Sequence, residues 1–136
     1  MSFESAMLTA ISGMRAQTKR LRVVAENLAN ANTTASTPGG DPYRRKTISF
    51  AAEVDRASGA HVVSVKKIGR DPSAFKREYE PGHPSAGPDG YVLQPNVKSM
   101  VELMDMQEAQ RSYEANLTMM SGARTMIQRT IDLLRS

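Results

Sequence analysis

The fold is decided by residues 97–134, VKSMVELMDMQEAQRSYEANLTMMSGARTMIQRTIDLL, a stretch without proline. Apolar residues recur in it at intervals of seven, which is the pattern of a coiled-coil seam and not of a strand. The first series is Leu103, Gln110, Leu117, Arg124 and Ile131, and the second is Met106, Tyr113, Met120, Ile127 and Leu134. The sequence therefore predicts one long helix over 97–134, about 57 Å in length at 1.5 Å per residue.

The N-terminal part of the chain has the same periodicity over residues 4–30, again without proline. One series is Met7, Met14, Leu21 and Leu28, and the other is Phe3, Ala10, Gln17 and Val24. Ser2 or Ser5 is the expected cap of this second helix. Gly13 costs a helix interior roughly 1 kcal/mol relative to alanine, so we interpret it as permitting the close approach of a partner backbone.

Between the helices the composition changes, because all seven prolines lie within residues 31–96 together with several turn dipeptides. Three short runs have the alternation or the β-branched residues of strands. These runs are residues 46–50, 61–65 and 75–79. We expect a small, poorly filled β region or a long, partly ordered loop, and not a compact catalytic domain.

The chain thus divides into an N-terminal helix (1–32), a loop or β insert (33–96) and a C-terminal helix (97–136). Helices of this length do not persist alone in water, so each seam needs a partner. The simplest arrangement is a mainly α fold in which the terminal helices pair as an antiparallel coiled coil around a small irregular or β insert.

The bulk composition excludes several classes of protein. The chain has 136 residues, enough for about one domain, and no cysteine for a disulfide, thiol nucleophile or thiolate metal site. Its longest N-terminal apolar run, Ala6-Met7-Leu8, is far too short for a signal peptide, so any export is expected to use another route. The net charge of +4 is spread among interspersed acids, which indicates a solvated mixed surface more than a phosphate-binding stripe.

The sequence shows no catalytic or metal-binding pattern. His61 and His83 are the two histidines, and neither lies in a metal-ligand spacing or beside a carboxylate cluster. Phosphate-binding, nucleophile-elbow and dinucleotide motifs are also missing from the sequence. We therefore expect no enzyme, no metal and no cofactor, and we keep a basic helical nucleic-acid-binding or adaptor module as the alternative to a structural protein.

Short motifs along the chain resemble those of flagellar rod and hook axial proteins. The N-terminal signature is Asn27-Leu28-Ala29-Asn30 followed by Ala31-Asn32-Thr33, and the C-terminal signature is Arg111-Ser112-Tyr113-Glu114-Ala115-Asn116. The stretches between them are similar to those of the short proximal-rod type, namely Pro42-Tyr43-Arg44-Arg45-Lys46, Glu80-Pro81-Gly82-His83-Pro84, Gly90-Tyr91-Val92 and Pro95-Asn96-Val97. The resemblance spans nearly the whole chain.

This resemblance implies a self-assembling subunit of the flagellar basal-body rod, which crosses the periplasm and transmits motor torque. It implies export by the flagellar type III apparatus without a cleaved signal peptide. The implied partners are further copies, sister rod proteins of the FlgB, FlgF and FlgG types, and the rod–MS-ring junction protein FliE; no nucleic acid and no membrane insertion are implied. Its motif residues here are Asn27, Leu28, Asn30, Arg111, Tyr113 and Asn116.

Two readings stay open for the motif residues. Asn27 and Asn30 lie on one helix face and either end the helix, since asparagine tolerates the left-handed C-cap conformation, or bond a neighbouring backbone in the assembly. Tyr113 occupies a seam position with Asn116 three residues on, which favours core packing over a contact between subunits.

The charged residues suggest a second assembly feature. Arg15, Lys19 and Arg22 form a stripe away from the N-terminal seam, and Glu102, Asp105 and Glu108 lie largely outside the C-terminal one. Such stripes are usually solvated, but these two are able to pair between subunits and set their register. The basic run Arg44-Arg45-Lys46 either meets an acidic neighbour or protects an exposed strand edge from aggregation.

Overall fold

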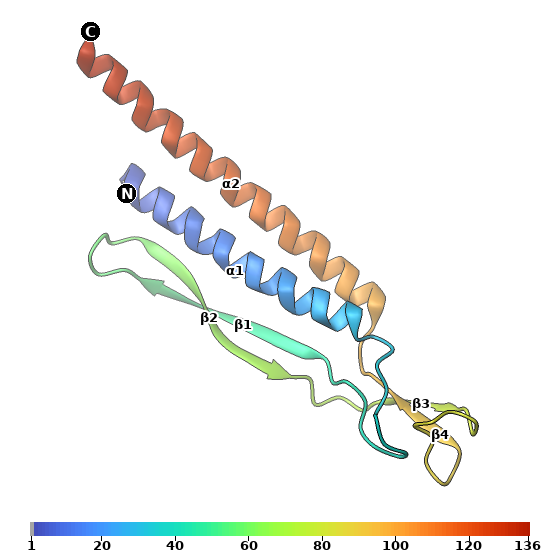
Figure 1. The fold of residues 1–136 in the computed structure, drawn as a ribbon. Helices are drawn as coiled ribbons and strands as arrows, with labels where there is room; N and C mark the ends of the chain where they lie inside the picture. Colours follow the sequence, from blue (N-terminus) through green and yellow to red (C-terminus); the bar gives the residue numbers. More distant parts are fainter. Residues whose placement is uncertain (1) are drawn as a thin grey trace. The chain divides into compact units, whose positions relative to one another are not determined.

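The computed structural model describes residues 2–136, and both predicted helices and a small β insert are confirmed (Figure 1). The elements are α1 (Phe3–Ala29), β1 (Lys46–Val54), β2 (His61–Arg70), β3 (Lys76–Tyr79), β4 (Tyr91–Gln94) and α2 (Ser99–Arg135). Among the described residues, neither helix combines the length and the apolar character needed to span a bilayer.

The first helix begins and ends at hydrogen-bonded side chains. The backbone N–H of Ser5 donates to Ser2 Oγ and that of Ser2 donates to Ser5 Oγ, both at 3.1 Å, so Ser2 is the cap in a reciprocal arrangement. At the other end Asn30 Nδ2 donates to the Glu26 carbonyl at 2.9 Å. Asn30 thus follows the last residue of α1, as one of the two readings predicted, but the left-handed conformation in that reading is wrong, because among the described residues only glycines have positive φ.

The insert consists of two separate two-stranded sheets, β1–β2 and β3–β4. The turn between β1 and β2 is closed by hydrogen bonds from Asp55 N to Ala60 O (2.8 Å) and from Gly59 N to Asp55 O (2.7 Å). Gly59 has a φ of 71°, a conformation that glycine adopts readily. β3 and β4 are antiparallel, with Lys76 opposite Gln94 and Tyr79 opposite Tyr91; β4 was not among the predicted strands.

By its internal contacts the chain forms two compact units, each of which draws on all three predicted segments. The first unit comprises residues 2–21, 48–67 and 106–136, and the second comprises residues 22–47 and 68–105.

In the first unit α1 contacts both the β1–β2 hairpin and α2 (Figure 1). Ser12 Oγ accepts a hydrogen bond from Val63 N–H at 3.0 Å and thereby occupies a donor of the β2 edge. On the side of α2, Gly13 lies against the side chain of Asn116, and Arg20 pairs with Glu108 at 3.4 Å. Residue numbers therefore fall along α2 as they rise along α1.

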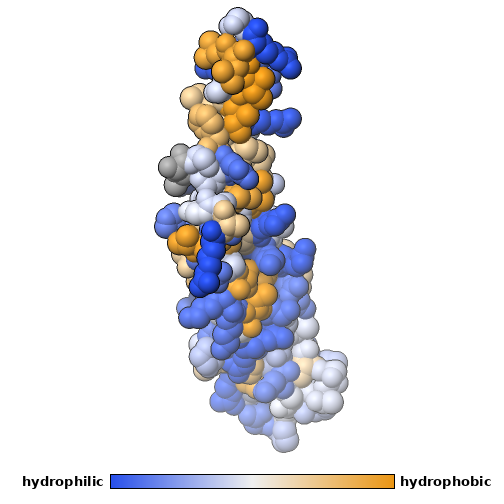
Figure 2. Space-filling view, turned by 90° about the vertical axis from the view of Figure 1, so that its left-hand side faces the viewer, coloured by the Kyte–Doolittle hydropathy of each residue, from blue (hydrophilic) through white to orange (hydrophobic). Residues whose placement is uncertain are grey.

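This register leaves the last turns of α2 beyond the start of α1. α1 begins at Phe3, ten residues before Gly13, and ten residues past Asn116 is Met126. Residues 127–135 therefore extend past the first residue of α1 in this unit (Figure 1). Figure 2 shows a hydrophobic cluster at the top, over the end of α2, where Met126, Leu133 and Leu134 are exposed.

The face that α2 buries is one residue out of phase with the first predicted series. Glu102, Ala109 and Ala123 are its buried positions, whereas Leu103 and Leu117 are exposed. Among the other seam residues, Met106, Tyr113, Met120 and Ile127 are half-buried, as are Met7, Met14, Leu21 and Leu28 of α1, and Ile131 and Leu134 are exposed. The physical reason is side-chain size: the small alanines let the helix backbones approach closely, and the larger leucines then remain outside the contact between the helices.

In the second unit the long loops are tied together around Val92 and Ser85, which are both buried. Ser85 Oγ donates to the Ala35 carbonyl, and the Ser85 carbonyl accepts from Gly39 N–H at 3.1 Å. The loop that joins β3 to β4 is thus held against the residues that follow α1.

Candidate assembly site

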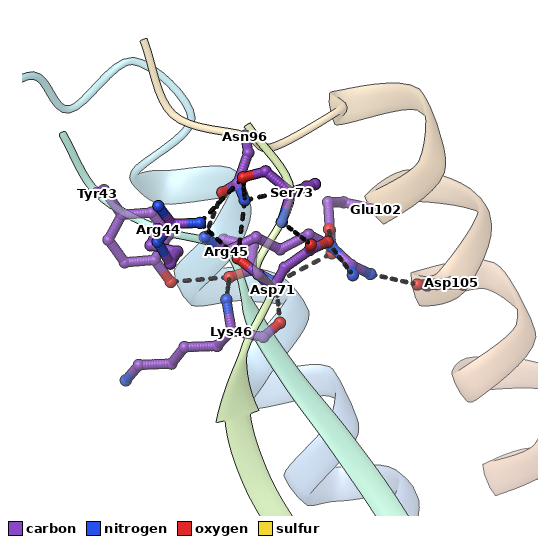
Figure 3. A network of polar contacts seen from close by, with 10 residues as sticks. Tyr43, Arg44, Arg45, Lys46, Asp71, Ser73, Asn96, Glu102 and Asp105 are labelled. Carbon is purple, nitrogen blue, oxygen red and sulfur yellow. Dashed lines mark hydrogen bonds and ion pairs between the residues drawn. The ribbon is translucent and has the colours of Figure 1, made fainter. Parts of the chain in front are cut away.

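A network of polar side chains in the second unit brings together four distant parts of the sequence (Figure 3). We call it the Asn27–Arg45 node. Its members are Asn27, Tyr43, Arg44, Arg45, Lys46, Asp71, Ser73, Asn96, Glu102 and Asp105.

Asn27 binds the backbone of the segment that enters β1. Its Nδ2 donates to the Lys46 carbonyl and its Oδ1 accepts from Lys46 N–H, both at 2.9 Å. These two bonds satisfy the groups that a neighbouring strand would otherwise pair. The Tyr43 hydroxyl donates to the same Oδ1 at 2.8 Å. Since Asn27 is almost completely buried, its amide fixes where the chain passes the end of α1.

Glu102 connects α2 to this position. Its side chain is completely buried, and Oε2 accepts from Asn27 Nδ2 at 3.3 Å while Oε1 accepts from Arg45 Nε. A buried carboxylate requires such partners, because burying an unpaired charge is strongly unfavourable. The prediction that Glu102 pairs with another subunit is therefore wrong, since its partners are Asn27 and Arg45 of the same chain.

Arg45 makes the largest number of charged contacts in the node. Besides Glu102, its guanidinium reaches Asp71 Oδ2 at 3.4 Å and Asp105 Oδ2 at 3.5 Å. Burial alone would lower the pKa of Arg45, but hydrogen bonds and charge contacts with Glu102, and then with Asp71, outweigh burial and raise this pKa. Arg45 therefore stays charged and holds three carboxylates together.

Asn96 joins the residues before α2 to the same network. Its Oδ1 accepts from Arg45 N–H at 2.7 Å, and its Nδ2 donates to the carbonyls of Asp71 at 3.0 Å and Ser73 at 3.1 Å. The Ser73 backbone N–H, followed by its hydroxyl, lowers the pKa of Asp71. One side chain thus connects the segments that carry Arg45 and Asp71 to the start of α2.

The other two residues of the predicted basic run also have partners in their own chain. Arg44 Nη1 donates to the Asp71 carbonyl at 2.7 Å, and its guanidinium lies 4.1 Å from the centre of the Phe75 ring, a cation–π distance. Lys46 Nζ pairs with Glu26 Oε2 at 2.5 Å, and this hydrogen bond, followed by the Lys46 charge, lowers the pKa of Glu26. Burial raises the pKa of Tyr43.

The node holds chain segments together, because its side chains bond to backbone groups and to one another. Within residues 2–136, no three histidine, cysteine, aspartate or glutamate side chains are arranged to hold a metal ion. His83 lies elsewhere, where its Nδ1 accepts from Ser85 N–H at 3.0 Å.

The C-terminal signature lies in the first unit. Asn116 Nδ2 donates to the Ser112 carbonyl at 2.9 Å and packs against Gly13. Gly13 thus permits the close approach of a side chain of its own chain. Tyr113 is half-buried, while Arg111 is exposed. Asn30, from the N-terminal signature, ends α1 and bonds Glu26 and Thr33.

The predicted basic stripe of α1 is exposed, whereas the predicted acidic residues of α2 have partners in their own chain. Arg15, Lys19 and Arg22 of α1 are exposed, and their pairing with another subunit stays a prediction. Asp105 contacts Arg45 and Glu108 contacts Arg20. Sequence reasoning missed the role of Asp71 and Ser73, whose one signal was the turn dipeptide Asp71-Pro72.

The chain matches two family models and several curated relatives. Residues 7–35 match the model described as flagella basal body rod protein, and residues 89–133 match the model of the flagellar basal body rod FlgEFG protein C-terminal region. Flagellar basal-body rod protein FlgC of Agrobacterium fabrum is 50% identical over 125 residues, 92% of this chain and 90% of the relative. The proteins of the same name from Salmonella typhimurium (37%, covering 90% of each chain) and Bacillus subtilis (35%, covering 97% of each) are also similar.

Proposed function

The chain belongs to the FlgC family of flagellar basal-body rod proteins, and from this premise we propose that it is a structural rod subunit that polymerises through its terminal helices and transmits motor torque. The similarity over nine-tenths of the chain to FlgC of Agrobacterium fabrum is the observation that carries the proposal.

The node supplies the mechanical part of this proposal. Asn27, Arg45 and Asn96 come from three of the stretches that resemble axial proteins, and they meet around the buried Glu102. A network in which each buried polar group has a partner is rigid and specifies one arrangement of its segments. Such a connection between the end of α1 and the start of α2 suits a subunit that must pass on torque without yielding.

We also propose that α1 and α2 pair as an antiparallel coiled coil. The contacts of Gly13 with Asn116 and of Arg20 with Glu108 support this pairing in the first unit. The half-buried series Met106, Tyr113, Met120 and Ile127 supplies one set of seam positions, and the buried alanines of α2 supply the other. Apolar residues left exposed would gain burial when subunits pack together.

The proposal includes the location, the export route and the neighbours of the subunit. The subunit acts as a structural protein without catalysis, lies in the rod across the periplasm, and reaches it through the flagellar type III apparatus. Its neighbours are rod proteins of the FlgB, FlgF and FlgG types and FliE. The family membership supports assembly with other rod components.

Hydrogen exchange on the isolated chain and on basal bodies that contain it tests the proposal. We expect residues 4–30 and 97–134 to exchange faster in the isolated chain than in the basal body, because assembly covers apolar residues of these helices that are exposed in the single chain. The basal bodies come from a strain in which the gene is deleted and a tagged copy of it is expressed instead. Equal protection in both samples, together with absence of the chain from basal bodies, would reject the rod assignment.

A further inference from the structure

A groove on the first unit lies between α1 and β2. It has a volume of about 350 Å³, and its apolar lining includes Leu8, Ile11, Val62 and Val65. Among the described residues, the sheet that contains β2 has two strands, and α1 and β2 supply most of the groove's lining. Its volume is enough for a few aliphatic side chains.

The rim of this groove is charged. Arg15 and Lys19 border it from α1, four residues apart on one helix face, and Asp55 borders it from the turn after β1. Two of the three residues of the predicted basic stripe therefore flank an apolar surface. A helix that enters the groove would need apolar residues along its ridge and carboxylates toward Arg15 and Lys19, with a cation toward Asp55.

The outer face of α2 has this chemistry. Leu103 and Leu117 are exposed there at a spacing of fourteen residues, with Arg111 and Glu114 between them on the same side of the helix. Both charged residues are exposed, and within residues 2–136 neither side chain has an ion pair or hydrogen bond. The exposed half of the C-terminal signature thus has no role inside its own chain.

We propose that the groove binds the outer face of α2 from a second copy of this chain. In this contact Glu114 lies toward Arg15 and Lys19, Arg111 lies toward Asp55, and Leu117 enters the apolar groove. The two surfaces differ, so the contact is head-to-tail, and every joined pair still has one free groove and one free α2 face. Further copies add to these free surfaces, and the product is a ring or a filament and not a two-fold dimer. The inference rests on the proposed rod function and names one of its contacts.

Cysteine cross-linking tests the contact, because the chain has no cysteine of its own. One copy carries Lys19→Cys and the other Glu114→Cys, and both are produced in a strain without the natural gene. Isolated basal bodies are oxidised and run without reductant. We expect a disulfide-linked species of twice the 14.9 kDa chain mass. The control pair combines Lys19→Cys with Arg129→Cys, an exposed position outside the proposed contact, and should give none.

The outcomes separate this contact from the rod function itself. Both variants in basal bodies without a linked pair would overturn the contact and leave the rod function standing. A linked species of another mass would show a different rod protein in the groove and would equally overturn it. Absence of even the unmodified chain from basal bodies would overturn the rod function.

A charge exchange provides an independent measurement of the same contact. Lys19→Glu and Glu114→Lys should each abolish swimming, since each places like charges together across the contact. The double variant restores the opposite charges, and we expect swimming to return. Normal swimming in both single variants would contradict the contact.

Discussion

A Cβ atom at Gly13 would lie 2.6 Å from Nδ2 of Asn116, which is closer than side chains approach one another. The two residues belong to different helices of the first unit and lie more than a hundred positions apart in the sequence. The Asn116 amide therefore fits against α1 only because residue 13 has no side chain. The amide is additionally fixed by its hydrogen bond to the Ser112 carbonyl.

Gly13→Ala should consequently fail to stabilise the protein, although alanine is normally favoured over glycine in a helix by about 1 kcal/mol. The added methyl group forces Asn116 to rotate and to lose its bond to Ser112. Chemical unfolding monitored by circular dichroism measures the difference. Gly122→Ala is the matched control, because its Cβ meets no atom within 4 Å, and it should gain the full amount. Equal gains at both positions would show that the contact with Asn116 does not constrain the helices.

Asn27→Ala should destabilise the protein by about 2–4 kcal/mol, because it leaves the backbone N–H and carbonyl of Lys46 unpaired and removes one of the two partners of the buried Glu102. Asn32→Ala serves as the control, since Asn32 is exposed, and it should have little effect. Denaturant titration of the purified chain gives both values. A loss for Asn27→Ala no greater than that for Asn32→Ala would contradict a structural role of the node.

Removal of one carboxylate should have very different consequences at the buried Glu102 and at the exposed Glu108 of α2. Glu102→Ala leaves the Arg45 charge partly buried without its closest partner, and we expect a loss of about 3–5 kcal/mol. Glu108→Ala removes an exposed partner of Arg20 and should cost at most about 1 kcal/mol. Denaturant titration compares the free energies of unfolding of the two variants. Similar losses of stability in both would contradict the burial of Glu102.

Stability should fall as the pH drops below the ordinary pKa values of Glu26 and Asp71, 4.5 and 3.8. Both pKa values are lowered in the folded chain, so the unfolded chain binds protons first and the stabilisation present at neutral pH disappears with acidification. Thermal melting between pH 7 and pH 3 measures this loss. The double variant Glu26→Gln and Asp71→Asn should show a weaker pH dependence, and an unchanged one would assign the effect to other carboxylates.

The two helices could be predicted closely from the sequence, because heptad spacing and the absence of proline determine where a helix runs. The phase of α2 could not be predicted. Apolar residues lie on more than one of its faces. The heptad pattern predicted that Leu103 and Leu117 are packed, whereas the buried positions are Ala109 and Ala123. Side-chain size, and not hydrophobicity, decides which face lies closest to a neighbouring helix.

The node could not be predicted for a related reason. Periodicity treats a charged residue such as Glu102 as facing solvent, and its partner Arg45 is 57 positions away in the sequence. The short stretches around Asn27, Arg45 and Asn96 were visible as motifs, but local patterns do not show which of them meet. Their convergence depends on tertiary contacts that only the folded chain displays.

The final turns of α2, which pass the beginning of α1, also bear on how long a free subunit survives in the cell. A helical end with exposed Leu133 and Leu134 and no neighbouring helix of its own chain frays readily, and frayed ends are where proteases cut. Copies that find no place in a polymer would be cleared first, while incorporated copies are shielded. The turnover of surplus subunits would then follow directly from a difference in helix length.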